Sequence, residues 1–357
     1  MPQELGLVAE GQLGIPPLPY RNKSFLAFLA TQFLGAFNDN VFKQLVLLQC
    51  VRYTVLGMDL QSLVQLLFAL PFLLLSGLAG DLADKVGKGW MMQVCKAAEI
   101  LVMLAGLGAF WLGASVAGAG AAAGEVPPFL WLLAGVTFLM GTQSAFFGPP
   151  KYGGLPELVR SEDLSPATGL TQMTTFLAVI FGVSFAGYLF DAFGDRLWIP
   201  GTVVVGIAIA GTWTARGIAR NEAADPERRI TARSLLSVLP TLRRIRRSDR
   251  LLWLAMLLYS WFWLVGGVSL TAINAYGRLQ LGLSNVETSL MVASLSLGIA
   301  AGSALVGRLS PGRVRFELSR RGLVLMAVCL IALAFVPAHA PTPQELDQFV
   351  AQKFVAA

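Results

Sequence analysis

One short stretch, Gly80-Asp-Leu-Ala-Asp-Lys-Val-Gly-Lys88, separates two long apolar runs at about 61–80 and 91–113. Its charged residues are Asp81, Asp84, Lys85 and Lys88. Each neighbouring run has roughly the 20 apolar residues that a helix needs to cross the hydrocarbon core of a bilayer. Charged side chains are unstable in lipid unless they are paired or hydrated. The stretch therefore predicts two membrane-spanning helices that are joined by a tight turn in water.

The same alternation of apolar runs and charged turns continues along the chain. Of the 357 residues, 55% are hydrophobic and 13% are charged, whereas an average soluble domain is about 25% charged. Helices satisfy their backbone hydrogen bonds internally, as lipid requires, and the runs lack the alternating pattern of barrel strands. We therefore predict an all-α membrane protein. Its nine apolar runs are at about 24–50, 61–80, 91–113, 128–148, 167–190, 197–217, 251–276, 286–307 and 321–337.

The positive charges predict the orientation in the membrane. Most of the 27 Lys and Arg residues fall on alternate loops, on the side that holds the N-terminus. By the positive-inside rule, the N-terminus is expected to be cytoplasmic. A nucleic-acid-binding protein would present one continuous basic face, which these dispersed charges do not form. Residues 1–20 lack an apolar region behind a basic start, so we expect no cleavable signal peptide.

A long basic stretch divides the chain into two blocks. We expect a cytoplasmic tail at 1–23, a six-helix bundle at 24–217, a basic cytoplasmic linker at 218–250, a partial bundle of about three helices at 251–337 and a polar tail at 338–357. Two related halves joined in this way are typical of transporters with a central site. Because the second block is shorter than the first, we expect a truncated chain.

The linker contains its own helix signal. Apolar residues recur at helical spacing between Leu235 and Ile245, and arginines lie among them. This pattern predicts an amphipathic helix on the membrane surface, with its arginines against anionic lipid head groups.

Catalytic and cofactor motifs are not found in the sequence. His339 is the only histidine, which excludes a Ser-His triad and a multi-histidine zinc site. No Walker loop or Gly-x-Ser-x-Gly elbow occurs. The single cysteines Cys50, Cys95 and Cys329 lack metal-like or disulfide spacing. We therefore expect neither an enzyme nor a bound cofactor or metal.

A polar face in the first apolar run is the candidate binding site. Gln32, Asp39 and Lys43 fall on one face of a helix, and Asn38 and Asn40 widen it. A lone charge in mid-membrane costs about 3 kcal/mol on insertion scales, and pairing of Asp39 with Lys43 would reduce that cost. One interpretation is a cavity in which Asp39 meets a cationic group, such as the ammonium of an ethanolamine head group. The alternative is a polar cluster that packs helices together.

Lys151 is the candidate partner for a phosphate. The preceding Gly148-Pro149-Pro150 is expected to end the fourth helix, which would place the lysine at the cytoplasmic mouth. The alternative is an interface anchor made with Tyr152. Lys96 and Glu99, three residues apart, are expected to pair on their helix.

Small residues predict close helix contacts in two places. Gly80 is expected to permit close approach of a neighbouring helix. Ser294, Gly298 and Gly302 form a stripe at four-residue spacing, which is typical of tightly packed membrane helices.

The Gly80–Lys88 stretch resembles the signature between the second and third helices of the major facilitator superfamily, whose pattern is Gly-x-Leu-Ala-Asp-Lys/Arg-x-Gly-Lys/Arg. This resemblance implies two helical bundles that rock about a central site. It also implies that the signature latches the conformations of the transporter. The positions concerned are Gly80, Asp81, Asp84, Lys85, Gly87 and Lys88.

Three further segments resemble the bacterial lysophospholipid transporter family: Gln32 to Asn40, Phe147 to Glu157 and Ala167 to Phe176. Members of that family flip lysophospholipids to the cytoplasmic leaflet of the inner membrane. There an acyltransferase/acyl-ACP synthetase, fused or separate, restores the second chain. The expected function is therefore lysophospholipid flipping by alternating access. The alternatives are a proton-coupled exporter of small amphipathic solutes and a membrane anchor for an acyltransferase.

Overall fold

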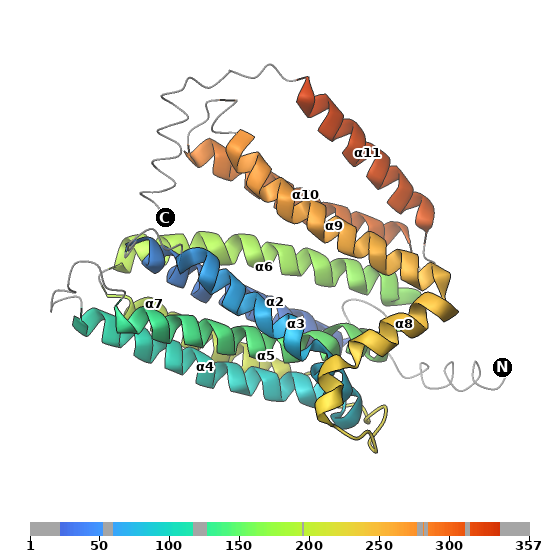
Figure 1. The fold of residues 1–357 in the computed structure, drawn as a ribbon, viewed down its shortest axis with the longest axis horizontal. Helices are drawn as coiled ribbons and strands as arrows, with labels where there is room; N and C mark the ends of the chain where they lie inside the picture. The colour runs from blue at the N-terminus through green and yellow to red at the C-terminus, as the bar shows by residue number, and fades with distance from the viewer. Residues whose placement is uncertain are drawn as a thin grey trace.

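The computed structural model describes residues 22–52, 60–116, 127–194, 196–276, 281, 285–310 and 315–335. Within these ranges every regular element is a helix, as Figure 1 shows. The all-α prediction is therefore confirmed. Nearly all of the predicted tails at 1–23 and 338–357 lies outside the described residues.

Each predicted apolar run corresponds to a long helix. Most ends differ from those of the runs by a few residues, whereas α3 and α5 continue well into the polar residues that follow their runs. The helices are α2 (Lys23–Arg52), α3 (Leu60–Val86), α4 (Lys88–Val116), α5 (Pro128–Leu158), α6 (Leu164–Phe193), α7 (Trp198–Ala215), α9 (Arg250–Ala275), α10 (Asn285–Leu309) and α11 (Phe316–Ala334). The predicted linker helix is α8 (Val238–Ser248), and short 3-10 helices lie at η1 (Ser161–Asp163) and η2 (Ala232–Leu236).

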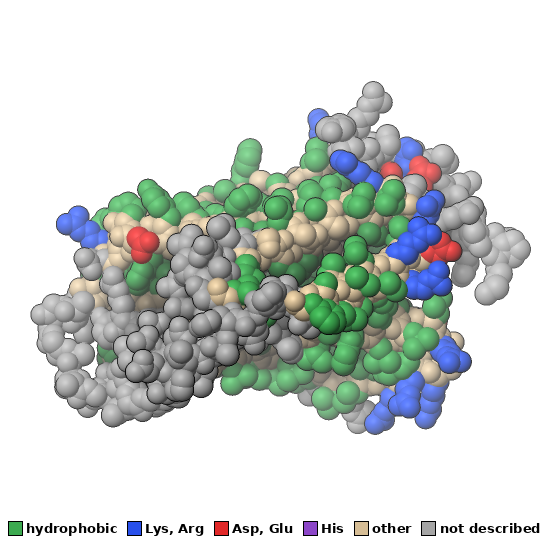
Figure 2. All heavy atoms as spheres, turned by 90° about the horizontal axis from the view of Figure 1, so that it is seen from above, with side chains coloured by type: hydrophobic (Ala, Val, Ile, Leu, Met, Phe, Trp, Pro, Cys, Tyr) green, Lys and Arg blue, Asp and Glu red, His purple; other side chains and the backbone are tan. Residues whose placement is uncertain are grey.

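The outer faces of the helices expose many apolar side chains. In the described part of the chain, the five helices that are long and apolar enough to cross a membrane are α3, α4, α5, α7 and α6 together with η1. Large apolar side chains such as Leu73, Trp111 and Trp213 are exposed on them. Figure 2 shows apolar side chains along the flank, whereas Lys and Arg gather mainly at the end that holds α8. A surface this apolar requires a bilayer around it.

Helices α2 to α7 pack into one bundle. α2 lies against α6 and α7, α3 against α5, and α4 against α5 and α7. The central apolar cluster includes Phe42, Met103, Phe110, Leu133 and Met140, all almost fully buried. Because α2 is enclosed by these neighbours, its polar side chains face the interior of the bundle.

The second block contacts the first mainly through α10, which packs along α6 (Figure 1). At this crossing, a Cβ added to Gly169 would lie 2.5 Å from the Ser303 carbonyl oxygen and 3.1 Å from the Gly307 Cα. The predicted stripe of small residues does not make the contact, since a Cβ on Gly298 or Gly302 would meet no described atom within 4 Å. The small residues of α10 that pack against α6 are Ser303 and Gly307, which lie closer to the C-terminal end of the helix.

The prediction that the fourth helix ends at Gly148-Pro149-Pro150 is wrong. α5 continues through Pro149 and Pro150 to Leu158. Prolines are tolerated in membrane helices where neighbouring helices support the backbone, and here Pro150 is buried against such neighbours. Lys151 consequently lies within the helix, and it is buried.

Candidate functional site

The polar residues of α2 point to three different helices. Successive helical residues differ by about 100° around the axis, so Asn38, Asp39 and Asn40 cannot share one direction. Asn38 Nδ2 donates to Glu99 Oε1 of α4 at 2.8 Å. Ser144 Oγ of α5 donates to Asp39 Oδ2 at 2.6 Å. Asn40 Nδ2 donates back to a carbonyl of its own helix at 2.7 Å, on the side that faces α6.

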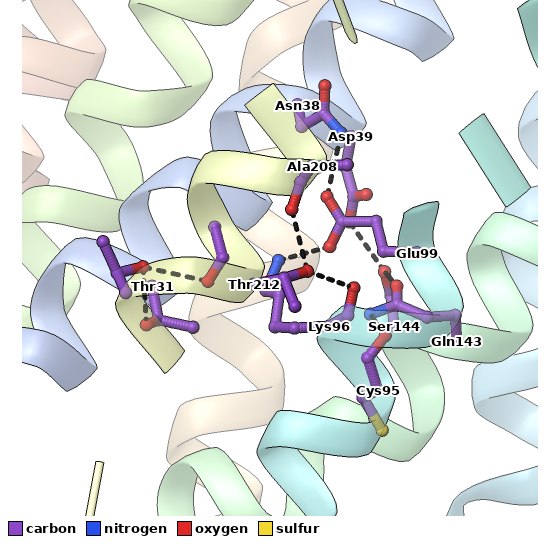
Figure 3. Close-up of polar contacts among 12 residues, drawn as sticks. Thr31, Asn38, Asp39, Cys95, Lys96, Glu99, Gln143, Ser144, Ala208 and Thr212 are labelled. Atoms are coloured by element: carbon purple, nitrogen blue, oxygen red, sulfur yellow. Dashed lines mark hydrogen bonds and ion pairs between the residues drawn. The ribbon is translucent and has the colours of Figure 1, made fainter. Parts of the chain in front are cut away.

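The Asp39 carboxylate is incompletely partnered. Its second oxygen, Oδ1, is buried and accepts no hydrogen bond from any described residue. The Ser144 hydroxyl is shared, because it also lies 3.1 Å from Gln143 Oε1 (Figure 3). The predicted ion pair with Lys43 is not formed; the Lys43 ammonium lies over the Phe68 ring, 4.8 Å from its centroid. The open carboxylate oxygen is suited to a cation or a hydrogen-bond donor.

Lys96 and Glu99 form the expected ion pair, and both side chains are only 2% exposed. The Lys96 ammonium lies 5.3 Å from the centroid of the Phe147 ring. Gly35 leaves the space for this ammonium, since a Cβ there would collide with Lys96 Nζ. Thr212 fixes the backbone by donating to the Lys96 carbonyl at 2.7 Å. Because each charge is neutralised by the other, we call Lys96–Glu99 the closed pair and interpret it as a structural contact.

Lys151 is a buried ammonium without a carboxylate partner in the described chain. The residue is 9% exposed, and its Nζ donates to Thr175 Oγ1 at 3.3 Å. It also lies 5.2 Å from the centroid of the Tyr152 ring. Thr175 in turn donates to Gln32 Oε1 at 2.8 Å. A buried charge is normally paired, so this ammonium is suited to an anion.

The two open charges lie at different levels of the bundle. Asp39 is joined to Ser144, and Gln32 is joined through Thr175 to Lys151. Because Gln32 and Asp39 are seven residues apart on α2, and Ser144 and Lys151 are seven apart on α5, the two helices run antiparallel. Seven residues rise by about 10 Å. The site thus has an acidic level and a basic level, separated by about two helical turns.

The Gly80–Lys88 stretch, here called the signature turn, contacts the linker. The predicted turn is shorter than expected, because α3 runs to Val86 and α4 begins at Lys88, which leaves only Gly87 between the two helices. Arg228 donates from Nε and Nη2 to Asp81 Oδ1 at 3.0 and 2.6 Å. Its Nη1 lies 3.6 Å from Asp84 Oδ2. These contacts, led by the hydrogen bond to Asp81, raise the pKa of Arg228 above its ordinary value. An arginine side chain is charged at physiological pH in any case, and these contacts favour its charged form.

The other signature residues are placed around the same end. Lys88 pairs with Glu157, and Lys85 is a half-buried residue in the last turn of α3. Gly87 has a φ of 82°, a conformation that favours glycine, and so closes the turn. Gly80 does not make the predicted close contact, since a Cβ there would meet no described atom within 4 Å.

Sequence reasoning missed the partners that come from other helices. Ser144, Thr175 and Arg228 complete the three polar contacts, but each is far from its partner in the chain. Spacing along one helix identifies residues that share a face. It carries no signal for a hydroxyl or guanidinium that only tertiary packing brings near.

Comparison with known proteins gives a consistent family match. The sequence profile of the Major Facilitator Superfamily matches residues 24–346. The lysophospholipid transporter LplT of Klebsiella pneumoniae is 27% identical over 320 residues, which is 88% of this chain and 72% of the relative. LplT of Serratia proteamaculans is 27% identical over 327 residues, 88% of this chain and 73% of the relative. LplT of Yersinia pestis is 27% identical over 303 residues, 81% of this chain and 66% of the relative.

Proposed function

Because the chain belongs to the Major Facilitator Superfamily, and is thus a multi-pass membrane transporter, we propose that it flips lysophospholipids across the bacterial inner membrane by alternating access. Helices α2 to α7 form the N-terminal half in this proposal, and α9 to α11 belong to the second half. The end that holds the signature turn and α8 faces the cytoplasm, because Lys and Arg concentrate there.

The observation that carries the proposal is the pair of open, opposite charges inside the first bundle. Asp39 has a buried carboxylate oxygen without a hydrogen-bond partner in the described chain. The only hydrogen bond of the Lys151 ammonium there is to a threonine hydroxyl, and its other contact is the Tyr152 ring. Each charge is unfavourable in a low-dielectric site until a counter-charge arrives. A zwitterionic head group supplies both counter-charges in one molecule.

We assign the two ends of the head group accordingly. Asp39 receives the ammonium of an ethanolamine group, with Asn38, Asn40 and Lys43 on neighbouring faces of the same helix. Lys151 receives the phosphate, and Gln32 holds the Thr175 hydroxyl that orients it. Charge-assisted hydrogen bonds of this kind are about twice as strong as neutral ones, which favours a zwitterion over a neutral solute.

Aromatic side chains near this site are the proposed contact for the acyl chain. Phe176 of α6 stacks on Trp263 of α9, with ring centroids 6.1 Å apart. Tyr259 meets the same tryptophan edge to face at 6.2 Å. The aromatic surface spans the seam between the two blocks of helices, and an alkyl chain at such a seam leaves its head group inside the bundle. An aromatic surface beside two open charges favours an amphipathic substrate.

The chemistry of the flipped lipid indicates which enzyme would act next. A lysophospholipid that reaches the cytoplasmic leaflet lacks one acyl chain, so an acyltransferase, separate or fused, is the enzyme that would consume it. The relatives named as lysophospholipid transporters support the substrate class.

Transfer of labelled lysophosphatidylethanolamine into proteoliposomes tests the proposal. The purified chain is expected to move the lipid between leaflets faster than protein-free vesicles do. Uptake of amphipathic solutes that follows a pH gradient and is unaffected by lysolipid would instead indicate a proton-coupled exporter. Folded protein without any transfer activity would indicate a membrane anchor for an acyltransferase.

A further inference from the structure

Residues 218–237, here called the strap, cross the end of the bundle that carries the signature turn. Near its start, the Ile218 carbonyl accepts a hydrogen bond from Gln93 Nε2 of α4 at 3.1 Å. Near its end, the Ser234 carbonyl oxygen lies 2.6 Å from where a Cβ on Gly77 of α3 would sit. The strap, which joins α7 to α8, is thus packed against α3 and α4.

The strap fits the backbone of the signature turn closely. A Cβ added to Gly87 would lie 2.7 Å from the Asn221 carbonyl oxygen, and one added to Gly89 would collide with the Ala219 carbonyl. The Asp225 N–H donates to the Asp84 carbonyl at 2.9 Å. Gly87 in the turn and Gly89 at the start of α4 therefore leave room for a second stretch of backbone.

Arg228 is the one strap side chain that meets the acidic residues of the turn in the described structure. It binds Asp81, whose side chain is 11% exposed, and lies within ion-pair distance of Asp84. Both carboxylates are near the C-terminal end of α3, where the helix dipole disfavours negative charge. The Arg228 guanidinium offsets both the burial of Asp81 and the unfavourable helix dipole. The ion pair therefore stabilises the signature turn and the strap together.

We propose that Arg228 is a positioning residue for transport, which fastens the strap to the signature turn and so fixes where α8 and the second block of helices begin. The strap contact itself does not depend on the substrate. Its consequence for transport rests on the proposed function.

Cysteine labelling tests the strap directly. Ala223→Cys places a thiol beside Gly87, whose added Cβ would lie 3.7 Å from the Ala223 nitrogen. The exposed Cys329 is replaced by Ser, whereas Cys50 and Cys95 are buried. In proteoliposomes, Arg228→Ala is expected to raise the rate of labelling by a charged maleimide about tenfold, the factor for losing a charge-assisted hydrogen bond. The exposed neighbour Arg229→Ala is the matched control and should label slowly.

The same variants test whether the contact between Arg228 and the signature turn affects transport. Arg228→Ala should lower lysolipid transfer severalfold relative to Arg229→Ala, and Arg228→Lys, which keeps a positive charge beside Asp81 and Asp84, should label more slowly than Arg228→Ala. Equal labelling of the two alanine variants would overturn the proposal, as would faster labelling with an unchanged transfer rate. If the parent protein transfers no lysolipid, the proposed function fails, and the labelling rates still decide whether Arg228 holds the strap.

Discussion

Single residues in the bundle interior fall into two groups by how their charges are balanced. Lys96 and Glu99 neutralise each other at 2% exposure, whereas Asp39 and Lys151 have no ion pair with a described residue. A closed pair contributes to the architecture of the bundle. An open charge at comparable depth is destabilising on its own, which is the reason to assign Asp39 and Lys151 to the substrate.

The closed pair should behave as a structural unit. Glu99→Gln leaves the Lys96 ammonium without its carboxylate and is expected to destabilise the protein by about 3–5 kcal/mol. The double variant Lys96→Met/Glu99→Leu removes both charges and should recover most of that loss. Thermal unfolding in detergent measures both effects. A single variant as stable as the parent would show that the pair contributes little.

The open ammonium should matter to transport and little to stability. Lys151→Gln removes the proposed phosphate contact and is expected to slow transfer of every lysophospholipid by roughly tenfold or more, the value of a hydrogen bond to a charged group. Lys23→Gln, at the exposed start of α2, is the control. Normal transfer by Lys151→Gln would remove this lysine from the site.

The sequence predicts these residues unequally. Spacing along one helix was sufficient to pair Lys96 with Glu99. The same reasoning paired Asp39 with Lys43, and the structure places Lys43 over Phe68 of α3 instead. An aromatic ring on a neighbouring helix competes for the ammonium, and no pattern within α2 reveals it.

Helices are the most predictable elements, because a long apolar run predicts a helix. Five of the described helices meet the length and apolarity of a full membrane span. The end of α5 is an exception, because the helix passes through Pro149 and Pro150. Local rules treat proline as a helix end, but packing around the bundle overrides them. The placement of Lys151 inside the helix follows from that exception.

The crossing of α3 and α5 should be sensitive to one added methyl group. A Cβ on Gly141 would collide with the Phe68 carbonyl oxygen and lie 3.0 Å from its carbonyl carbon. Gly141→Ala is therefore expected to cost about 1–3 kcal/mol through overpacking. Gly135→Ala, on the same helix with no described atom within 4 Å of the added Cβ, should be neutral or slightly stabilising. Thermal unfolding of both variants checks the difference, and equal stability would contradict the packing described here.

The α8 helix is confirmed, and its contact with anionic lipid remains a prediction. Its arginines and the apolar residues Val238 and Leu239 are exposed. Replacing Arg243, Arg244, Arg246 and Arg247 by Gln should weaken the dependence of transfer on phosphatidylglycerol, since each arginine near the surface contributes about 1 kcal/mol. High salt should reduce the same dependence in the parent protein. An unchanged dependence in the variant would exclude the contact.

On the scale of the whole molecule, the seam between the two blocks is the feature that sequence reasoning located least well. The stripe at Ser294, Gly298 and Gly302 was expected to pack, but the contact is made by Gly307 on Gly169. Ser303 and Gly307 have the same four-residue spacing as that stripe, and only the position of α6 distinguishes the two sets. The sequence predicts a turn over the whole Gly80–Lys88 stretch, but α3 continues to Val86 and only Gly87 lies between the helices. The partner Arg228 was not predicted.

The most direct test of the account compares two head groups in one transfer assay. Asp39→Asn keeps the shape of the side chain and its contact with Ser144, but it removes the charge proposed to bind the ammonium. We predict that transfer of lysophosphatidylethanolamine falls by about tenfold or more, whereas transfer of lysophosphatidylglycerol, which has no ammonium, changes little. Transfer of lysophosphatidylethanolamine at the parent rate, or an equal loss for both lipids, would contradict the account.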